Sequence, residues 1–231
     1  MRIAIIGAGN IGGTLTRRLS AIGHEVFVAN SRGPASLQEL AGATGARAVA
    51  VKDAVRGADV VVVTIPMKNI PDLPRDLFAG LPDGVVVVDT GNYYPRNRDG
   101  RLAGIEESRT ESDWVAKHLG RRVVKAFNNI YAQHLMEHGK PKGSPGRIAL
   151  PVAGDSAHDK AVVIRLLDEL GFDGVDAGPL SESWRQQPGS PVYGSDLDVE
   201  GVRGALAQAS PERKPEWKAT PQSPGTFDDP Q

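Results

Sequence analysis

Short hydrophobic runs alternate along the chain with segments of amphipathic character. The runs are rich in β-branched residues and bounded by turn residues, which is typical of buried parallel strands. We expect strands at residues 2–6, 25–29, 46–49, 60–65, 85–89, 123–126, 147–152 and 172–175. The amphipathic segments predict helices at 11–22, 36–41, 51–56, 114–119, 129–137 and 158–170.

This alternation predicts an α/β fold of the Rossmann type, with a doubly wound, mainly parallel sheet covered by helices on both faces. We expect residues 1–180 to form that domain. Residues 181–210 would form a small helical or loop extension, with one helix starting at Ser181 and another near 199–209. Residues 211–231 are rich in proline and polar groups, so we expect a mobile tail.

Composition narrows the chemistry. The 231 residues include no cysteine, which excludes disulfides, thiolate nucleophiles and cysteine-ligated metal centres. The formal net charge of −1 gives no basic footprint for nucleic acid. The apolar runs are too short for a signal peptide or a membrane span, so we expect a soluble, cytoplasmic protein.

The first strand runs into "GAGNIG", which places Gly7, Gly9 and Gly12 in the G-x-G-x-x-G spacing. The first glycine permits a tight turn, the second lets a pyrophosphate approach the backbone, and the third lets helix and strand pack closely. Asn10 and Ile11 open the helix, whose free N–H groups and positive dipole end favour phosphate. The motif therefore predicts a dinucleotide site.

The second strand ends in Asn30, Ser31 and Arg32 rather than in an acid. A carboxylate there would hold a free ribose 2′-hydroxyl and repel a 2′-phosphate. Arginine instead offers a planar fork of donors that suits phosphate. The pattern favours NADP(H) over NAD(H), with an ordinary solvated loop arginine as the alternative.

Three further strand ends carry unusual residues, and ligands collect at strand ends in open α/β sheets. Thr64, Ile65 and Pro66 end the fourth strand, where the last two offer either an apolar wall for a nicotinamide ring or a plain turn. The fifth strand ends in the polar quartet 89–92, which includes Gly91 and Asn92.

The sixth strand ends in the segment "KAFNN", residues 125–129. Asn128 is placed to cap the next helix, and Asn129 is placed to begin it. A capping role would explain the presence of one asparagine but not of both. Two adjacent asparagines beside Phe127, at a strand end that faces the same crevice, favour a ligand contact.

Together, "GAGNIGGTLTRRLSAIGHEV", "NSRG", "TIPM", "DTGN" and "VVKAFNNI" resemble the NADPH-dependent deazaflavin reductases, which are NADP oxidoreductases that use coenzyme F420. The cytosolic domains of the six-transmembrane ferric reductases are similar as well. The later segment "VAGDSAHDKAVVIRLLDELGFDGVDAGPL" also matches the family pattern, so the resemblance covers about residues 1–180.

The resemblance implies that residues 9–12 cradle the pyrophosphate and that Ser31 and Arg32 hold the 2′-phosphate. It implies that Ile65, Pro66, Asn92 and residues 126–128, that is Ala126, Phe127 and Asn128, surround the nicotinamide. Hydride would then pass directly between carbons, with no catalytic protein nucleophile. The protein would contribute alignment, with Asn92 and Asn128 as positioning residues.

The resemblance weakens in the segment 182–194, where we consider two roles. Trp184, Arg185, Gln187 and Tyr193 could grip an anionic or amide-bearing substrate. They could equally form a dimer interface, where Trp, Tyr and Arg are enriched. We expect a homodimer that acts on a small-molecule hydride acceptor.

Other chemistries find less support in the sequence. His134 and His138 have the i, i+4 spacing of metal ligands, but no third ligand with suitable spacing stands out, so we expect no metal. The Tyr-x-x-x-Lys pair of short-chain reductases and a P-loop are both absent. The sequence therefore favours an NADP(H)-dependent oxidoreductase with a deazaflavin, flavin or other small acceptor. The alternative is an NADP(H)-binding redox sensor without turnover.

Overall fold

The computed structural model describes residues 1–108, 110–214 and 217. Most of the tail predicted over 211–231 lies outside these residues. The strands within the described part are β1 (Arg2–Ile6), β2 (Glu25–Ala29), β3 (Arg47–Ala48), β4 (Val60–Val63), β5 (Val86–Asp89), β6 (Val124–Lys125), β7 (Ala149–Val152) and β8 (Asp173–Asp176). Its α-helices are α1 (Asn10–Ala21), α2 (Gln38–Thr44), α3 (Val51–Ala54), α4 (Glu111–Leu119), α5 (Ala132–Glu137), α6 (Ala157–Glu169) and α7 (Val199–Ala207).

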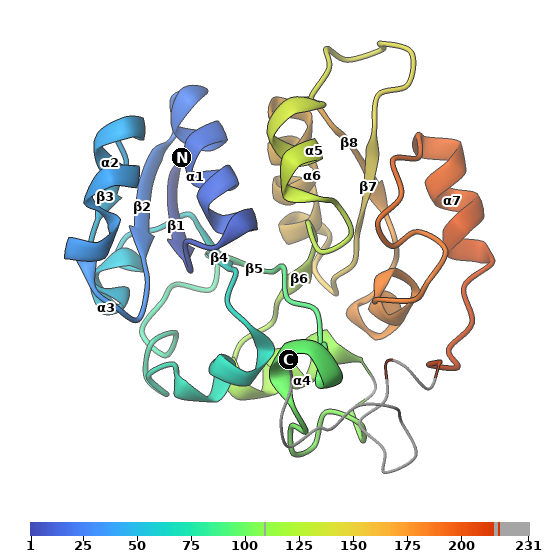
Figure 1. The fold of residues 1–231 in the computed structure, drawn as a ribbon, viewed down its shortest axis with the longest axis horizontal. Coiled ribbons are helices and arrows are strands. Elements are labelled where there is room, and N and C mark those ends of the chain that lie inside the picture. Colours follow the sequence, from blue (N-terminus) through green and yellow to red (C-terminus); the bar gives the residue numbers. More distant parts are fainter. Residues whose placement is uncertain (109, 215–216, 218–231) are drawn as a thin grey trace.

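The main sheet has six strands in the order β3-β2-β1-β4-β5-β6, and every neighbouring pair is parallel (Figure 1). The strand order changes direction at β1. The chain first adds β2 and β3 on one side of β1, and then adds β4, β5 and β6 on the other side. This topology confirms the predicted Rossmann-type α/β fold. In such a sheet, ligands bind at the carboxyl ends of the strands beside the reversal.

Both faces of the main sheet are buried. Ile3 and Ile5 of β1 enter a core shared with α1, α5 and α6, whereas Ala4 and Ile6 enter a second core shared with α3 and α4. Successive side chains of a strand point to opposite faces. A strand buried on both faces must be apolar at every position, which is why these strands read as continuous hydrophobic runs.

The strands β7 and β8 form a separate parallel pair, which lies with α7 on the right of Figure 1. An antiparallel bridge links this pair to the end of β6. The amide of Lys125 donates to the carbonyl of Ala153 at 2.8 Å, and the amide of Ala153 donates back at 3.1 Å. Apolar residues of α7, including Val202 and Leu206, close a third core against β7 and β8.

Arg18, near the end of α1, joins three helices. Its guanidinium donates to the carbonyls of Leu135 (2.6 Å), Met136 (3.2 Å) and Leu170 (2.5 Å), at the carboxyl ends of α5 and α6. The last carbonyls of a helix lack intrahelical partners, and a cation there also complements the helix dipole. Gly139 leaves room for this arrangement, since a Cβ there would lie 2.8 Å from a guanidinium nitrogen of Arg18.

Several predicted boundaries need correction. The helix expected at 129–137 begins at Ala132, with Tyr131 at its N-cap position, so Asn128 does not cap it and Asn129 does not begin it. The helix expected from Ser181 is a 3₁₀ helix, Leu180–Gln186. The helix α4 begins three residues before the predicted start because Thr110 caps it, accepting from the amide of Asp113 at 3.0 Å.

No helix in the described part of the chain is both long enough and apolar enough to cross a membrane. The predicted division of the chain at residues 180 and 210 remains a prediction.

Two glycines next to each other in α1 provide a test of the packing between helix and sheet. A Cβ on Gly12 would lie 2.0 Å from the carbonyl oxygen of Gly7, whereas a Cβ on Gly13 meets no atom closer than 3.8 Å. We expect Gly12→Ala to lower the free energy of unfolding by roughly 1–3 kcal/mol through overpacking. Gly13→Ala should raise it by up to about 1 kcal/mol through helix propensity. Urea unfolding of both variants measures the difference, and equal effects would contradict the close contact.

Candidate functional site

Two cavities lie at the carboxyl ends of the parallel strands. The Arg32 cavity, about 660 Å³, lies beyond β1, β2 and β4 and includes Gly7, Asn30, Ser31 and Arg32 in its lining. The Tyr94 cavity, about 400 Å³, lies beyond β4, β5 and β6. The predicted site residues that line the Tyr94 cavity alone are Asn10, Ile11, Gly91, Asn92, Phe127, Asn128 and Tyr193.

Gly9, Thr64, Ile65 and Pro66 line both cavities. The two hollows are therefore neighbours across one rim, formed by the glycine turn and the end of β4. An elongated ligand laid across this rim would place one end beside Arg32 and the other beside Asn92. Of the predicted cofactor residues, Gly12 and Ala126 line neither cavity, because Gly12 packs on Gly7 and Ala126 is fully buried.

The glycine turn fits a phosphate group. Gly7 has φ +108°, and a Cβ there would lie 2.2 Å from the carbonyl oxygen of Thr64, so this position needs glycine for packing. Gly9 differs, because a Cβ there would meet no atom within 4 Å. It occupies the N-cap position of α1, and no side chain caps this end of the helix, whose first N–H groups lack intrahelical partners. The space beside Gly9 is therefore available to an anion.

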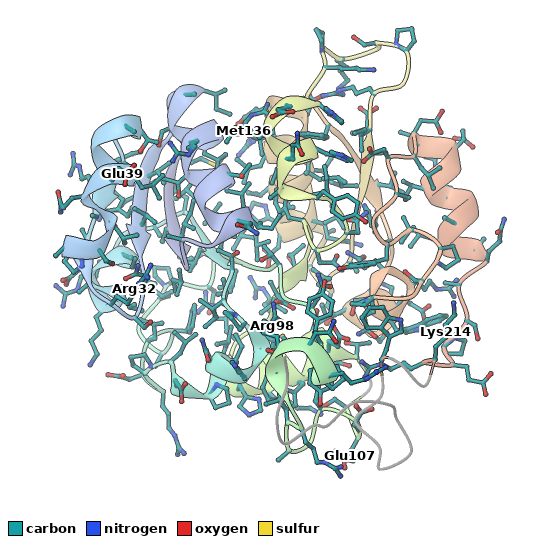
Figure 2. The ribbon with its side chains drawn as sticks, viewed as in Figure 1. Arg32, Glu39, Arg98, Glu107, Met136 and Lys214 are labelled. Atoms are coloured by element: carbon teal, nitrogen blue, oxygen red, sulfur yellow. The ribbon has the colours of Figure 1, made fainter. Side chains whose placement is uncertain are left out.

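The loop after β2 is held by Asn30. Its side-chain oxygen accepts from the amide of Arg32 at 3.0 Å, and its side-chain nitrogen donates to the hydroxyl of Ser36 at 2.9 Å. The guanidinium of Arg32 is exposed, and no residue of the described part makes an ion pair or hydrogen bond with it. Figure 2 shows Arg32 at the edge of the molecule, beyond the end of β2.

One acid lies in the Arg32 cavity that the sequence did not suggest. Asp72, exposed at the end of the 3₁₀ helix Met67–Asp72, contributes to the lining. After Pro66 the chain forms this 3₁₀ helix beside the strand ends, and Asp72 is its last residue. The lining of the cavity thus contains both a cation at the end of β2 and a carboxylate.

Asn92 and Asn128 bond to each other across the ends of β5 and β6. The side-chain nitrogen of Asn92 donates to the backbone oxygen of Asn128 at 2.8 Å, and that of Asn128 donates to the side-chain oxygen of Asn92 at 3.0 Å. Gln186 completes the group by donating to the side-chain oxygen of Asn128 at 2.9 Å. The two asparagine amides are therefore largely committed to protein partners, and they fix this wall of the Tyr94 cavity.

A buried ion pair lies beneath that wall. Asp89 and Lys125 are 3.1 Å apart, with 1% and 0% of their side chains exposed. Asp89 also accepts from the Ser112 hydroxyl at 2.7 Å and from the amide of Gly91 at 2.8 Å, while Lys125 donates to the carbonyl of Gly91. The pair therefore holds both polar groups of Gly91 and sets the direction in which the chain leaves β5.

Phe127 has an unusual backbone conformation at the floor of the Tyr94 cavity. Its φ of 60° makes it the one non-glycine residue with a positive φ in the described part of the chain. Such backbone strain persists only where the surroundings fix it. Here the phenyl ring is buried in the main core, and the flanking Asn128 is held by Asn92 and Gln186.

Two tyrosines with bonded hydroxyl groups also line the Tyr94 cavity. The hydroxyl groups of Tyr94 and Tyr193 are hydrogen-bonded to each other. Burial raises the pKa of Tyr94, and burial together with this contact raises the pKa of Tyr193. Both phenols therefore stay neutral at physiological pH and supply aromatic surface with a polar tip.

Arg98 is the cation of the Tyr94 cavity, and Figure 2 shows it near the centre of the molecule. It donates to the backbone oxygen of Asn92 at 2.5 Å and pairs with the buried Asp99 at 2.8 Å. Neither Tyr94 nor Arg98 was predicted as a site residue from the sequence. The two tyrosines after the polar quartet were the available signal, but the turn that brings Arg98 back, Pro95–Asp99, has no clear periodicity.

The structure separates the four residues predicted in the segment 182–194. Tyr193 reaches the Tyr94 cavity, but Trp184 and Gln187 line hollows on another side of the 3₁₀ helix, beside Glu212 and Arg213. Arg185 pairs with Glu182 at 2.6 Å and donates to a carbonyl of α7 at 3.1 Å. From this helix, Gln186 points toward the strand ends instead.

The comparisons with known proteins agree with this geometry. The model of the family "NADP oxidoreductase coenzyme F420-dependent" matches residues 2–93. The F420-dependent NADP reductase of Methanothermobacter thermautotrophicus is 30% identical over 197 residues, which is 75% of this chain and 82% of that protein. A solved structure of a hypothetical protein from Sinorhizobium meliloti is 34% identical, covers 85% of this chain and 95% of its own, and has a TM-score of 0.72.

Protein YjhV of Escherichia coli is 38% identical over 99 residues, 42% of this chain, and the match spans only 64% of YjhV. The fold and the glycine turn are those of Rossmann oxidoreductases, and the matching family model and relative are NADP oxidoreductases. Within that class, the chain belongs to the family of coenzyme F420-dependent NADP oxidoreductases.

The buried ion pair gives a prediction for this site. Lys125→Met would leave the carboxylate of Asp89 buried without its cation, so we expect the free energy of unfolding to fall by about 3–5 kcal/mol. Lys142→Met is the matched control, because Lys142 pairs with Asp168 at 3.5 Å with 78% of its side chain exposed. That change should stay within roughly 0.5 kcal/mol. Denaturant unfolding compares them, and similar losses in both variants would contradict the structural role of Lys125.

Proposed function

We propose that this protein transfers a hydride between NADP(H) and a flat acceptor of the deazaflavin or flavin type. The proposal depends on one observation, which is that the Arg32 cavity and the Tyr94 cavity are neighbours across a shared rim. The Arg32 cavity has the size and charge for the phosphorylated adenosine half of NADP, and the Tyr94 cavity lies where the nicotinamide half would end.

The charge at the end of β2 supports NADP rather than NAD. Arg32 has no partner among the described residues, and Ser31 beside it is exposed. A 2′-phosphate would supply the anion that Arg32 lacks, through charge-assisted hydrogen bonds to its guanidinium. Asp72 lines the same cavity, where its carboxylate would accept hydrogen bonds from sugar or base.

The protein's own contribution would be alignment and exclusion of water. When bound, NADPH supplies the hydride itself, so no protein nucleophile is required. Ile65 and Pro66 give an apolar wall on the shared rim, and Phe127 and Asn128 give a rigid floor beyond it. Holding two rings in one geometry supplies most of what direct hydride transfer needs.

The acceptor would share the Tyr94 cavity with the nicotinamide. Tyr94, Tyr193 and Tyr131 surround that space, together with Ile11 and Ile130. Aromatic and aliphatic surface suits a flat conjugated ring, and polar groups in the same lining, such as Arg98, would orient it. The relative from Methanothermobacter thermautotrophicus is named for coenzyme F420, so a deazaflavin is the first acceptor to test. A sensor of NADP(H) would need no such space beyond the shared rim.

The role of Arg32 can be tested by cofactor preference. We expect Arg32→Ala to weaken the binding of NADPH by about 1.5–3 kcal/mol, which is the value of a hydrogen bond to a charged group. The binding of NADH should stay almost unchanged. Arg17→Ala is the matched control, since Arg17 is an exposed arginine on α1 outside both cavities. Dissociation constants from fluorescence titration give the comparison. Equal losses for the two cofactors would refute the assigned role of Arg32.

The acceptor is tested by following the loss of NADPH absorbance with a deazaflavin, FMN, ferric chelates and small quinones in parallel assays. We expect the deazaflavin to be reduced fastest, because its ring matches both the relative's named cofactor and the aromatic walls. Tight NADPH binding without turnover on any acceptor would contradict the enzyme proposal and favour the sensor.

A further inference from the structure

A second cluster of chemically capable side chains lies outside both cavities. It consists of His134 and His138 on α5, the latter at the helix C-cap, and Asp196 from the segment before α7. One potential ligand atom from each residue lies within 4.8 Å of the others. The third ligand is not evident from sequence spacing, because Asp196 lies 62 residues beyond His134.

Contacts within the cluster hold its potential ligand atoms close together. Nδ1 of His134 lies 2.7 Å from one carboxylate oxygen of Asp196 and 3.0 Å from the other. The rings of His134 and His138 are stacked, with centroids 4.4 Å apart and planes inclined by 19°. No residue of the described part makes a hydrogen bond to the ring nitrogens of His138.

We propose that His134, His138 and Asp196 bind one divalent transition-metal ion of the zinc type. Two imidazole nitrogens and one carboxylate oxygen form a donor set that zinc and its neighbours favour over magnesium or calcium. Bonds of about 2.0–2.2 Å require ligand atoms about 3.3 Å apart. These side chains are partly exposed, so small rotations of their side-chain torsions bring the atoms to that spacing.

A shallow hollow beside the cluster contains one acid and one base besides the cluster's own residues. Glu137 and Lys140 line the same shallow hollow as His138 and Asp196. The ammonium of Lys140 is committed to the carbonyls of Pro145 and Gly146, at 3.1 Å and 3.0 Å. The three proposed ligands leave at least one coordination position open, and water from this hollow would fill it.

The ion would connect two pieces of chain that border the Tyr94 cavity. Asp196 follows Tyr193 closely in the chain, and the amide of Gly194 between them donates to the carbonyl of Asn129 at 2.9 Å. The ring of Tyr131, just before α5, packs edge-on against His134 with centroids 5.3 Å apart. A metal bond from Asp196 to α5 would therefore fix the wall that carries Tyr193 and Tyr131.

Isothermal titration of the full-length, tag-free protein with zinc chloride tests this proposal. We expect one zinc ion per chain in the wild type. We expect the zinc affinity to fall by about tenfold or more in each of the variants His134→Gln, His138→Gln and Asp196→Asn. Even changes outside the ligand shell lower metal affinity by about 10–100-fold. His158→Gln is the matched control, because His158 is an exposed histidine on α6 outside the cluster, and it should bind like the wild type.

Cobalt(II) provides a second measurement on the unaltered chain, so that the test does not depend on the folding of any variant. Binding at the cluster should give the visible absorption bands of cobalt held by nitrogen and oxygen ligands, and added zinc should remove them. The proposal is overturned if the wild type binds no zinc, or if zinc binds with unchanged affinity to all three ligand variants.

Discussion

Lys125 is a charged residue that is fully buried at the end of β6, and its pairing with Asp89 is the constraint on which the site depends. A buried charge is tolerated only with a close partner and further hydrogen bonds, and Asp89 has both. The main chain of Lys125 meanwhile bridges to Ala153, next to β7. One residue thus joins the parallel sheet to the β7–β8 pair and aims the turn at Gly91.

The binding surface depends on that junction. Asn92 follows Gly91 and is held by Asn128, which in turn is held by Gln186 from the distal part of the chain. The nicotinamide end of the site is therefore built from strand ends that the ion pair sets in place. The other end is simpler, with a glycine turn and one arginine whose charge has no partner in the described residues.

The sequence predicted those features that depend on local rules. Buried strands such as β4 are apolar at every position, and the glycine turn and Arg32 have fixed places relative to strand ends. It could not predict that Asn92 and Asn128 bond to each other, because that contact joins residues 36 positions apart. The start of α5 was also missed, since nothing in the local sequence shows that Asn128 and Asn129 are held by the distal segment instead.

Asp196 and Gln186 illustrate the same limit at greater separation. Both enter their clusters from the chain after β8, where the family resemblance ends and where helix or strand periodicity is weak. Their positions depend on how the last part of the chain packs on β7 and α5. Residue types there suggest polar contacts, but only the fold determines the partners.

Arg18 has a mechanical consequence for how this protein admits its ligands. By binding the carboxyl ends of α5 and α6 from the last turn of α1, it ties these three helices to one another. Many two-lobed enzymes open and close about a hinge between such elements. A displacement of α1 against α5 and α6 would break all three of these hydrogen bonds, so the cross-link opposes opening along α1. Movements of the loops at the rim of the cavities carry no such cost.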